Sequence, residues 1–151
     1  MTRILFLCHG NICRSPMAEF VMRDLVRRKG LSNQIETASA ALHRDALGWP
    51  PHEGTRKKLA QQGIYTDGKV AVLACRQDYD KYDYLIGMDR ENLSDMHRLF
   101  GEDRAGKIHL LLDFTDHPRD VADPWYTDDF DATWQDVNEG CAALLTHILA
   151  K

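Results

Sequence analysis

The amino-acid sequence predicts an α/β fold with an open parallel four-stranded sheet and helices on both of its faces. Short apolar runs alternate along the chain with segments in which apolar residues recur every three or four positions. Continuous apolar runs such as residues 4–7 are typical of strands that are buried on both faces. The 151 residues contain no internal repeat or linker, so we expect one domain over residues 1–151.

The first strand and the first helix are expected at residues 3–7 and 15–29. Ser15 can cap this helix, Pro16 suits its first turn, and Gly30 suits its end. The apolar residues that share one face of the helix are Ala18, Val21, Met22 and Leu25.

The other elements follow the same alternation. Further strands are expected at residues 34–38, 83–87 and 107–112, and further helices at residues 51–62, 89–100 and from residue 131 onward. The last helix has one apolar side, formed by Trp134, Val137, Cys141, Leu144 and Ile148. This order of elements predicts a flavodoxin-like arrangement of three layers, with a phosphate loop after the first strand.

The loops that follow the strands predict where a ligand binds. In open parallel sheets, ligand sites lie beyond the carboxyl ends of the strands. The loops at residues 8–15, 39–48, 88–89 and 113–130 each follow one of the four strands. We therefore expect them to meet at one edge of the sheet.

Composition excludes several classes of function. The net charge of −4 and the pI near 5.9 give no support for nucleic-acid binding, which needs a basic surface. The apolar run at residues 4–7 is too short for a signal peptide or a membrane span, so we expect a cytoplasmic protein without a membrane partner. Four cysteines without a dense framework fit free thiols in a reducing compartment.

Residues 7–16, LCHGNICRSP, combine features of an anion-binding loop. A tight turn between a strand and a helix aims several backbone N–H groups into one concavity, which suits a phosphate-like dianion. Gly10 and Asn11 tolerate the left-handed backbone that such a turn requires. Arg14 adds a planar guanidinium that can pair with two phosphoryl oxygens. The expected phosphate-binding residues are His9, Gly10, Asn11, Ile12, Cys13 and Arg14.

Cys8 lies at the mouth of this loop and is the candidate nucleophile. The field that holds phosphate also favours the thiolate form of a cysteine. Cys8 could then attack a bound phosphorus. Ser15 can donate its hydroxyl to the sulfur, which would make the thiolate a better leaving group in the second step. A cysteine after a buried strand is also compatible with inert packing, but the flanking Gly, Asn and Ser-Pro favour a reactive site.

With CHGNICRSP at residues 8–16 and DPWY at residues 123–126, the chain resembles the low-molecular-weight protein tyrosine phosphatases over essentially its whole length. Protonation of the departing phenolate needs an acid, and Asp120, Asp123, Asp128 and Asp129 all lie in the loop after the fourth strand. The resemblance selects Asp123 as general acid and then base. It implies a phosphocysteine intermediate and no metal or cofactor, and none of the seven histidines has the spacing of a zinc site.

The same resemblance describes the expected substrate cleft. Trp125 and Tyr126 look like one wall, although ordinary packing would also explain them. An aromatic slot admits an aryl phosphate, whereas phosphoserine is too short. His9 and Ile12 are expected to face the slot, and His9 is equally compatible with simple exposure. The expected partners are phosphotyrosyl proteins or peptides, with inorganic phosphate as product and inhibitor, and we expect a monomer.

Cys13 is the second cysteine of the loop. The resemblance implies a reversible Cys8–Cys13 disulfide, for which a curled loop would bring the two Cα atoms close enough. Cys75 and Cys141 are expected to be buried thiols. The sequence departs from many relatives at residues 39–45, which lack the glycine of a Ser-Ala-Gly segment, and at Lys69–Val72, where many relatives carry a histidine and an arginine.

Three functions other than a protein tyrosine phosphatase are compatible with a similar loop. A thiol-dependent arsenate reductase needs relay cysteines, but Cys75 is solitary and Cys141 lies on a helix face. A protein-arginine phosphatase is less favoured because such relatives tend to carry threonine where this chain has Ile12. A non-catalytic phosphotyrosine-binding module has no use for Asp123.

Overall fold

The computed structural model describes residues 1–151 and contains one parallel four-stranded sheet with the strand order β2-β1-β3-β4. The strands are β1 (Thr2–Cys8), β2 (Ile35–Ala41), β3 (Tyr84–Gly87) and β4 (Ile108–Leu110). The chain leaves β1 on one side for β2 and later returns to the other side of β1 for β3. The carboxyl end of β1 is therefore the point where the winding direction reverses, and this is where open α/β sheets bind ligands.

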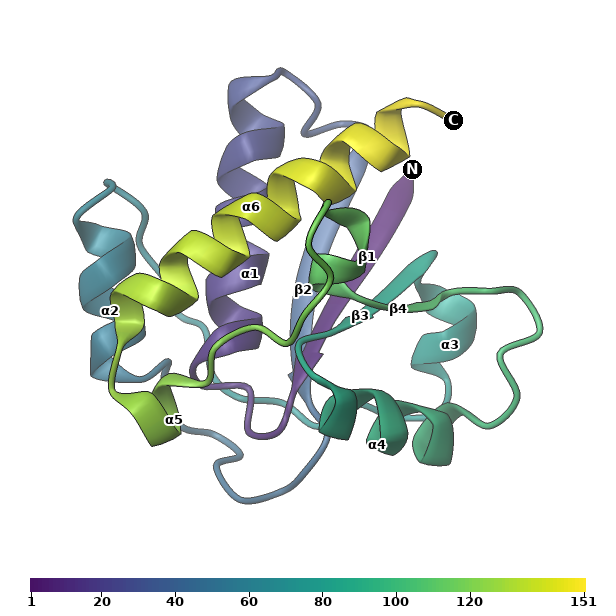
Figure 1. Ribbon diagram of the computed structural model, residues 1–151, viewed down its shortest axis with the longest axis horizontal. Helices are drawn as coiled ribbons and strands as arrows, with labels where there is room; N and C mark the ends of the chain where they lie inside the picture. The colour runs from purple at the N-terminus through teal and green to yellow at the C-terminus, as the bar shows by residue number, and fades with distance from the viewer.

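Helices cover both faces of the sheet, which confirms the predicted fold class (Figure 1). They are α1 (Arg14–Arg28), α2 (Glu53–Ala60), α3 (Asp78–Lys81), α4 (Arg90–Phe100), α5 (Pro124–Thr127) and α6 (Phe130–Leu149), with a 3-10 helix η1 (Leu111–Phe114) after β4. No helix combines the length and the apolar character needed to cross a membrane.

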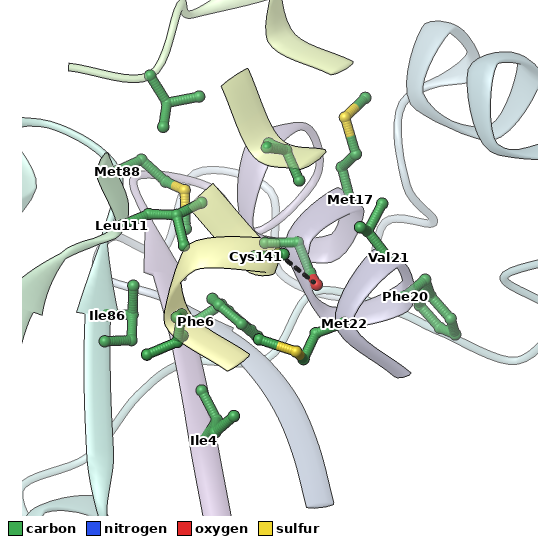
Figure 2. Packing of buried hydrophobic residues seen from close by; sticks show 14 of the residues in the cluster. Ile4, Phe6, Met17, Phe20, Val21, Met22, Ile86, Met88, Leu111 and Cys141 are labelled. Carbon is green, nitrogen blue, oxygen red and sulfur yellow. Dashed lines mark hydrogen bonds between the residues drawn. The ribbon is translucent and has the colours of Figure 1, made fainter. Parts of the chain in front are cut away.

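The larger part of the core lies between the sheet and the pair α1 and α6. Ile4 and Phe6 of β1 point toward this side, where Met22 of α1 and Cys141 of α6 meet them (Figure 2). The Cys141 thiol donates to the carbonyl oxygen of Ala18 at 3.7 Å. Cys8 belongs to the same buried cluster, so the candidate nucleophile is anchored by the core itself.

The opposite face of the sheet is covered by α4 and the short α3. Leu5 and Leu7 of β1 alternate with the residues of the first face and pack toward Met96 and Phe100 of α4. Because a strand turns successive side chains to opposite faces, this packing explains the unbroken apolar run at the start of the chain.

Several element boundaries differ from the sequence-based prediction. Ser15 is not the cap of α1, since the helix begins at Arg14 and Cys13 holds the cap position without a side-chain bond. β2 extends to Ala41, because residues 39–41 pair with residues 6–8 of β1. β4 ends at Leu110, where the chain turns into η1.

Cys75 is also not buried as expected. It is exposed in the turn that precedes α3, where its backbone N–H donates to Asp78 Oδ2 at 2.9 Å. Cys141 is buried, and this burial raises the pKa of its thiol.

Candidate active site

The loop between β1 and α1 connects Cys8 at the end of the strand to Arg14 at the start of the helix. Asn11 adopts a left-handed backbone with φ of 59°, as its residue type allows. Gly10 does not adopt a positive φ, so only Asn11 uses the left-handed conformation that both residue types tolerate. The loop is anchored from outside by the His52 N–H, which donates to the Ile12 carbonyl at 2.7 Å, and by Thr55 Oγ1, which donates to the Cys13 carbonyl at 3.1 Å.

Ser15 contacts the candidate nucleophile directly. Its Oγ lies 3.0 Å from Cys8 Sγ and accepts a hydrogen bond from Asn11 Nδ2 at 2.8 Å. Because the amide occupies an acceptor position of the hydroxyl, the hydroxyl hydrogen is free to point at the sulfur. The sequence therefore identified the right contact for Ser15 but the wrong backbone role.

A buried polar network braces Asn11 from behind. Its Nδ2 also donates to Ser39 Oγ at 2.9 Å, and Ser39 in turn donates to Glu19 Oε1 at 2.6 Å. Lys69 Nζ donates to the Ser39 carbonyl at 2.9 Å and lies 3.5 Å from Glu19 Oε1. The backbone N–H of Val72 donates to Asn11 Oδ1 at 3.2 Å. Lys69 and Val72 thus support the loop at the segment where many relatives carry a histidine and an arginine.

Arg14 lies almost fully buried beside Cys8 and between two carboxylates. Its Nη1 donates to Asp89 Oδ2 at 2.7 Å, and its Nη2 lies 3.3 Å from Asp123 Oδ2. Burial works to lower the pKa of Arg14, but the charges of Cys8, Asp123 and Asp89 outweigh it and raise the pKa. The guanidinium therefore stays charged, and Asp89 fixes its orientation from the N-terminus of α4.

Asp123 caps the short helix α5 and faces the same pocket. Its Oδ1 accepts from the Trp125 N–H at 3.1 Å, while its Oδ2 contacts Arg14. Of the other aspartates considered, only Asp120 also lines this pocket. Asp128 and Asp129 flank α5 and α6, where Asp129 accepts from the Ala132 N–H, and Asp120 accepts from the Arg90 N–H at the rim.

Cys13 shares the pocket with Cys8. Burial, followed by the charges of Cys8 and Asp123, raises the pKa of Cys13 to about 12. Cys13 is therefore a protonated thiol at neutral pH. Both thiols are free in the structure, and their disulfide stays a prediction.

One pocket of about 630 Å³ at the carboxyl edge of the sheet is lined by Cys8, Cys13, Arg14, Asp89 and Asp123. Trp125 and Tyr126 lie in its wall, as predicted, and their exposed fractions are 63% and 84%. Ile12 and His9 line it as well. Trp49, which is 55% exposed, is a further aromatic lining residue.

Sequence reasoning missed Trp49 and Asp89 as site residues. Trp49 lies just beyond the loop predicted to follow the second strand, and no motif marks it. Asp89 was predicted only as part of the 88–89 loop at this edge of the sheet, without a role of its own in the site. Its contact with Arg14 depends on the folded sheet, which brings the end of β3 beside the end of β1.

A buried thiol in the loop after β1, at the switch point of a parallel sheet and in one pocket with an arginine and a carboxylate, is the arrangement expected of a cysteine-dependent phosphatase. The family model described as low molecular weight phosphotyrosine protein phosphatase matches residues 3–151. The chain therefore belongs to this family of cysteine-dependent protein tyrosine phosphatases, and it is a hydrolase that acts on phosphotyrosine.

Individual relatives agree with this assignment. The chain is 43% identical over 150 residues to the low molecular weight protein-tyrosine-phosphatase YfkJ of Bacillus subtilis, covering 98% of this chain and 96% of the relative. The crystal structure of YfkJ matches with a TM-score of 0.96 and 42% identity, over 99% of this chain and 96% of that one. SP-PTP, a low molecular weight protein tyrosine phosphatase from Streptococcus pyogenes, matches with a TM-score of 0.87 and 36% identity, over 97% and 93% of the two chains.

Proposed function

We propose that Cys8 is the nucleophile, that Arg14 and the loop amides bind the phosphoryl group, and that Asp123 is the general acid and base. One observation carries this proposal: the buried sulfur of Cys8 contacts Ser15 Oγ at 3.0 Å in the pocket where Arg14 and Asp123 also meet. The substrate class is phosphotyrosine in proteins or peptides.

Phosphate binding uses the backbone of residues 9–14 and the side chain of Arg14. The loop precedes the 15-residue helix α1, so the helix dipole adds to the field of the amides. Arg14 is held by Asp89, which leaves the bond between its Nη2 and Asp123 as the one that a phosphoryl oxygen would replace. Binding the dianion would thus release Asp123 toward the leaving group.

The first chemical step transfers the phosphoryl group to sulfur. The Cys8 thiolate attacks phosphorus, the bond between phosphorus and the tyrosyl oxygen breaks, and protonated Asp123 gives its proton to that oxygen. In the second step Asp123 takes a proton from water, and the water oxygen attacks phosphorus. The phosphorus–sulfur bond breaks, inorganic phosphate leaves, and Ser15 stabilises the departing thiolate by donating its hydroxyl.

The aromatic pocket lining supports a preference for aryl phosphates. Trp49, Trp125 and Tyr126 present broad apolar surfaces against which a phenyl ring can pack. A phosphoserine side chain would carry its phosphate only a short distance from the peptide backbone. Inorganic phosphate, which fits the same loop, should act as product and as competitive inhibitor.

Rapid acid quench during turnover of a phosphotyrosyl peptide tests the assignment of the nucleophile. We expect a phosphorylated peptide that contains Cys8, found by mass spectrometry in the native chain and absent in Cys8→Ser. Phosphate on any other residue, or turnover without a phosphoenzyme, would contradict the proposal.

Redox control by the loop cysteines stays part of the proposal. Oxidation of Cys8 by a peroxide would give a sulfenic acid, and the Cys13 thiol would then displace water from it to form a disulfide. Peptide mapping after peroxide treatment should find a Cys8–Cys13 crosslink that a dithiol removes. A terminally oxidised Cys8 without the crosslink would argue against this role for Cys13.

The proposal also covers the cellular compartment and the partners of the chain. Four free thiols are in keeping with a reducing compartment such as the cytoplasm. We also propose a monomeric chain that acts as one domain over residues 1–151 and binds neither nucleic acid nor a membrane.

A further inference from the structure

His9 stands apart from the rest of the phosphate loop. It is the only residue from Cys8 to Ser15 that is exposed, and its side chain has an exposed fraction of 47%. It also lines the mouth of the pocket, directly after the proposed nucleophile. The mechanism above uses only the backbone of this residue, so its side chain is unexplained.

The imidazole of His9 is nevertheless held on two sides. Its ring stacks on His43, with ring centroids 4.1 Å apart and an angle of 21° between the planes. Its Nε2 lies 2.5 Å from Asp45 Oδ2. His43 is itself tied to α4, because its Nε2 lies 2.8 Å from Asp95 Oδ2.

These contacts join the phosphate loop to residues 42–49, which follow β2. The backbone N–H of His43 donates to the His9 carbonyl at 3.0 Å, so backbone and side chains fasten the same two positions. At its far end the segment carries Trp49, whose carbonyl accepts from the Ala71 N–H at 2.9 Å. The stacked imidazoles and their two carboxylate partners thus hold one end of residues 42–49. The other end of this segment carries Trp49, which forms part of the pocket wall.

Charge also favours this arrangement. Each imidazole faces its own carboxylate, His9 with Asp45 and His43 with Asp95, and Asp95 additionally pairs with Arg98 at 3.0 Å. Each ring of the stacked pair therefore has a carboxylate partner of its own.

We propose that His9, His43 and Asp45 are positioning residues that hold the 42–49 segment, and with it Trp49, at the mouth of the pocket. They act on the binding of the aromatic substrate and not on the chemical steps. This inference rests on the proposed function, because it assigns Trp49 a part in holding the phenyl ring.

A double-mutant cycle tests the inference. His9→Leu and Asp45→Ala should each raise KM for a phosphotyrosyl peptide about three- to tenfold while kcat stays within about twofold. The double variant should be no worse than His9→Leu alone, because both changes release the same contact. His43→Phe, which keeps a stackable ring, should retain more affinity than His43→Ala. Arg44→Gln, an exposed change on the same segment at a side chain that makes no hydrogen bond or ion pair, is the matched control.

The indole N–H resonance of Trp49 provides a readout that does not depend on turnover. We expect this resonance, assigned by its loss in Trp49→Phe, to shift or broaden in His9→Leu and to stay unchanged in Arg44→Gln. An unchanged KM and resonance in His9→Leu, fully additive effects in the cycle, or a fall in kcat alone would overturn the inference. Inactivity of the native chain would instead refute the proposed function. The Trp49 resonance would still show whether the contacts of His9 hold the 42–49 segment in place.

Discussion

Asp123 uses its two carboxylate oxygens for different purposes. One oxygen caps α5, so the carboxylate is fixed by the backbone N–H of Trp125. The other contacts Arg14, the group expected to turn toward phosphate. An acid placed in this way is pre-oriented before substrate binds, which is what proton transfer to a leaving group requires.

Asp123→Asn separates these two purposes, because asparagine caps a helix as well as aspartate does but has no proton to give. We expect kcat for a phosphotyrosyl peptide to fall about 10²–10⁴-fold. The loss should be much smaller for p-nitrophenyl phosphate, whose leaving group needs little protonation. Steady-state kinetics with both substrates measure the difference, and equal losses would speak against Asp123 as the acid.

The phosphate loop depends on elements that lie behind it. Glu19 of α1 is buried, and its charge is balanced by Arg23 and by Lys69 from the extended segment before α3. Ser39 of β2 connects Glu19 to Asn11 through two hydrogen bonds. Three elements distant in sequence therefore meet at one left-handed loop residue.

Lys69→Met should weaken this brace, because it leaves the buried carboxylate of Glu19 with less compensation. We expect the free energy of unfolding to fall by about 1–3 kcal/mol, measured by urea denaturation. Adding Glu19→Gln to Lys69→Met should restore part of the loss, since the uncompensated charge is then removed. A Lys69→Met variant as stable as the native chain would contradict this role.

Gly140 lets α6 lie directly on η1. A Cβ atom at this position would lie 2.4 Å from Leu111 Cγ, and Leu111 is fully buried. Alanine gains about 1 kcal/mol of helix propensity over glycine. The overlap should outweigh this gain. We therefore expect Gly140→Ala to lower the free energy of unfolding by about 1–2 kcal/mol net, measured by thermal unfolding. Leu111→Ala should relieve the overlap, and a stabilised Gly140→Ala would show that the two elements are not tightly packed.

The elements that the sequence predicts well are those with a strong pattern. β1 and α6 have an apolar run and a long periodic face, and both occur where expected. The four-residue helices α3 and α5 are too short to show a period, and they were missed. The end of β2 was missed because residues 39–41 are small or polar, and their pairing with β1 depends on the sheet as a whole.

At the scale of the whole molecule, Asp103 stabilises the edge of the sheet opposite the active site. Its carboxylate accepts from the Tyr79 hydroxyl at 2.6 Å and from the N–H groups of Lys107 and Ile108. Burial works to raise the pKa of Asp103, but these hydrogen bonds outweigh it and lower the pKa. Folding therefore favours the ionised form of this group.

The stabilising effect of Asp103 should depend on pH. Because its pKa is lowered in the folded state, the stabilisation is present above the unfolded-state pKa of about 3.9 and is lost as pH falls through the folded-state value. We expect Asp103→Asn to lower the free energy of unfolding by about 1–2 kcal/mol at pH 7. The gap to the native chain should narrow as pH falls below the unfolded-state pKa. A gap that is constant in urea titrations across this range would exclude the linkage.

The candidate site was predictable where its residues are contiguous. Cys8 to Ser15 form one motif, and Asp123 belongs to a second, so chemistry could be inferred from both. Asp89, Trp49 and Lys69 come from other loops, and only the folded sheet brings them to the same edge. Their roles depend on distances across the sheet, which local patterns do not encode.

Phosphate release from a phosphotyrosyl peptide in the presence of EDTA, compared across pH between the native chain and Cys8→Ser, tests the thiolate mechanism most directly. We predict that the native chain releases phosphate in EDTA with an optimum at mildly acidic pH, and that Cys8→Ser releases none. Release that needs a metal ion, or that persists without the Cys8 sulfur, would contradict the mechanism.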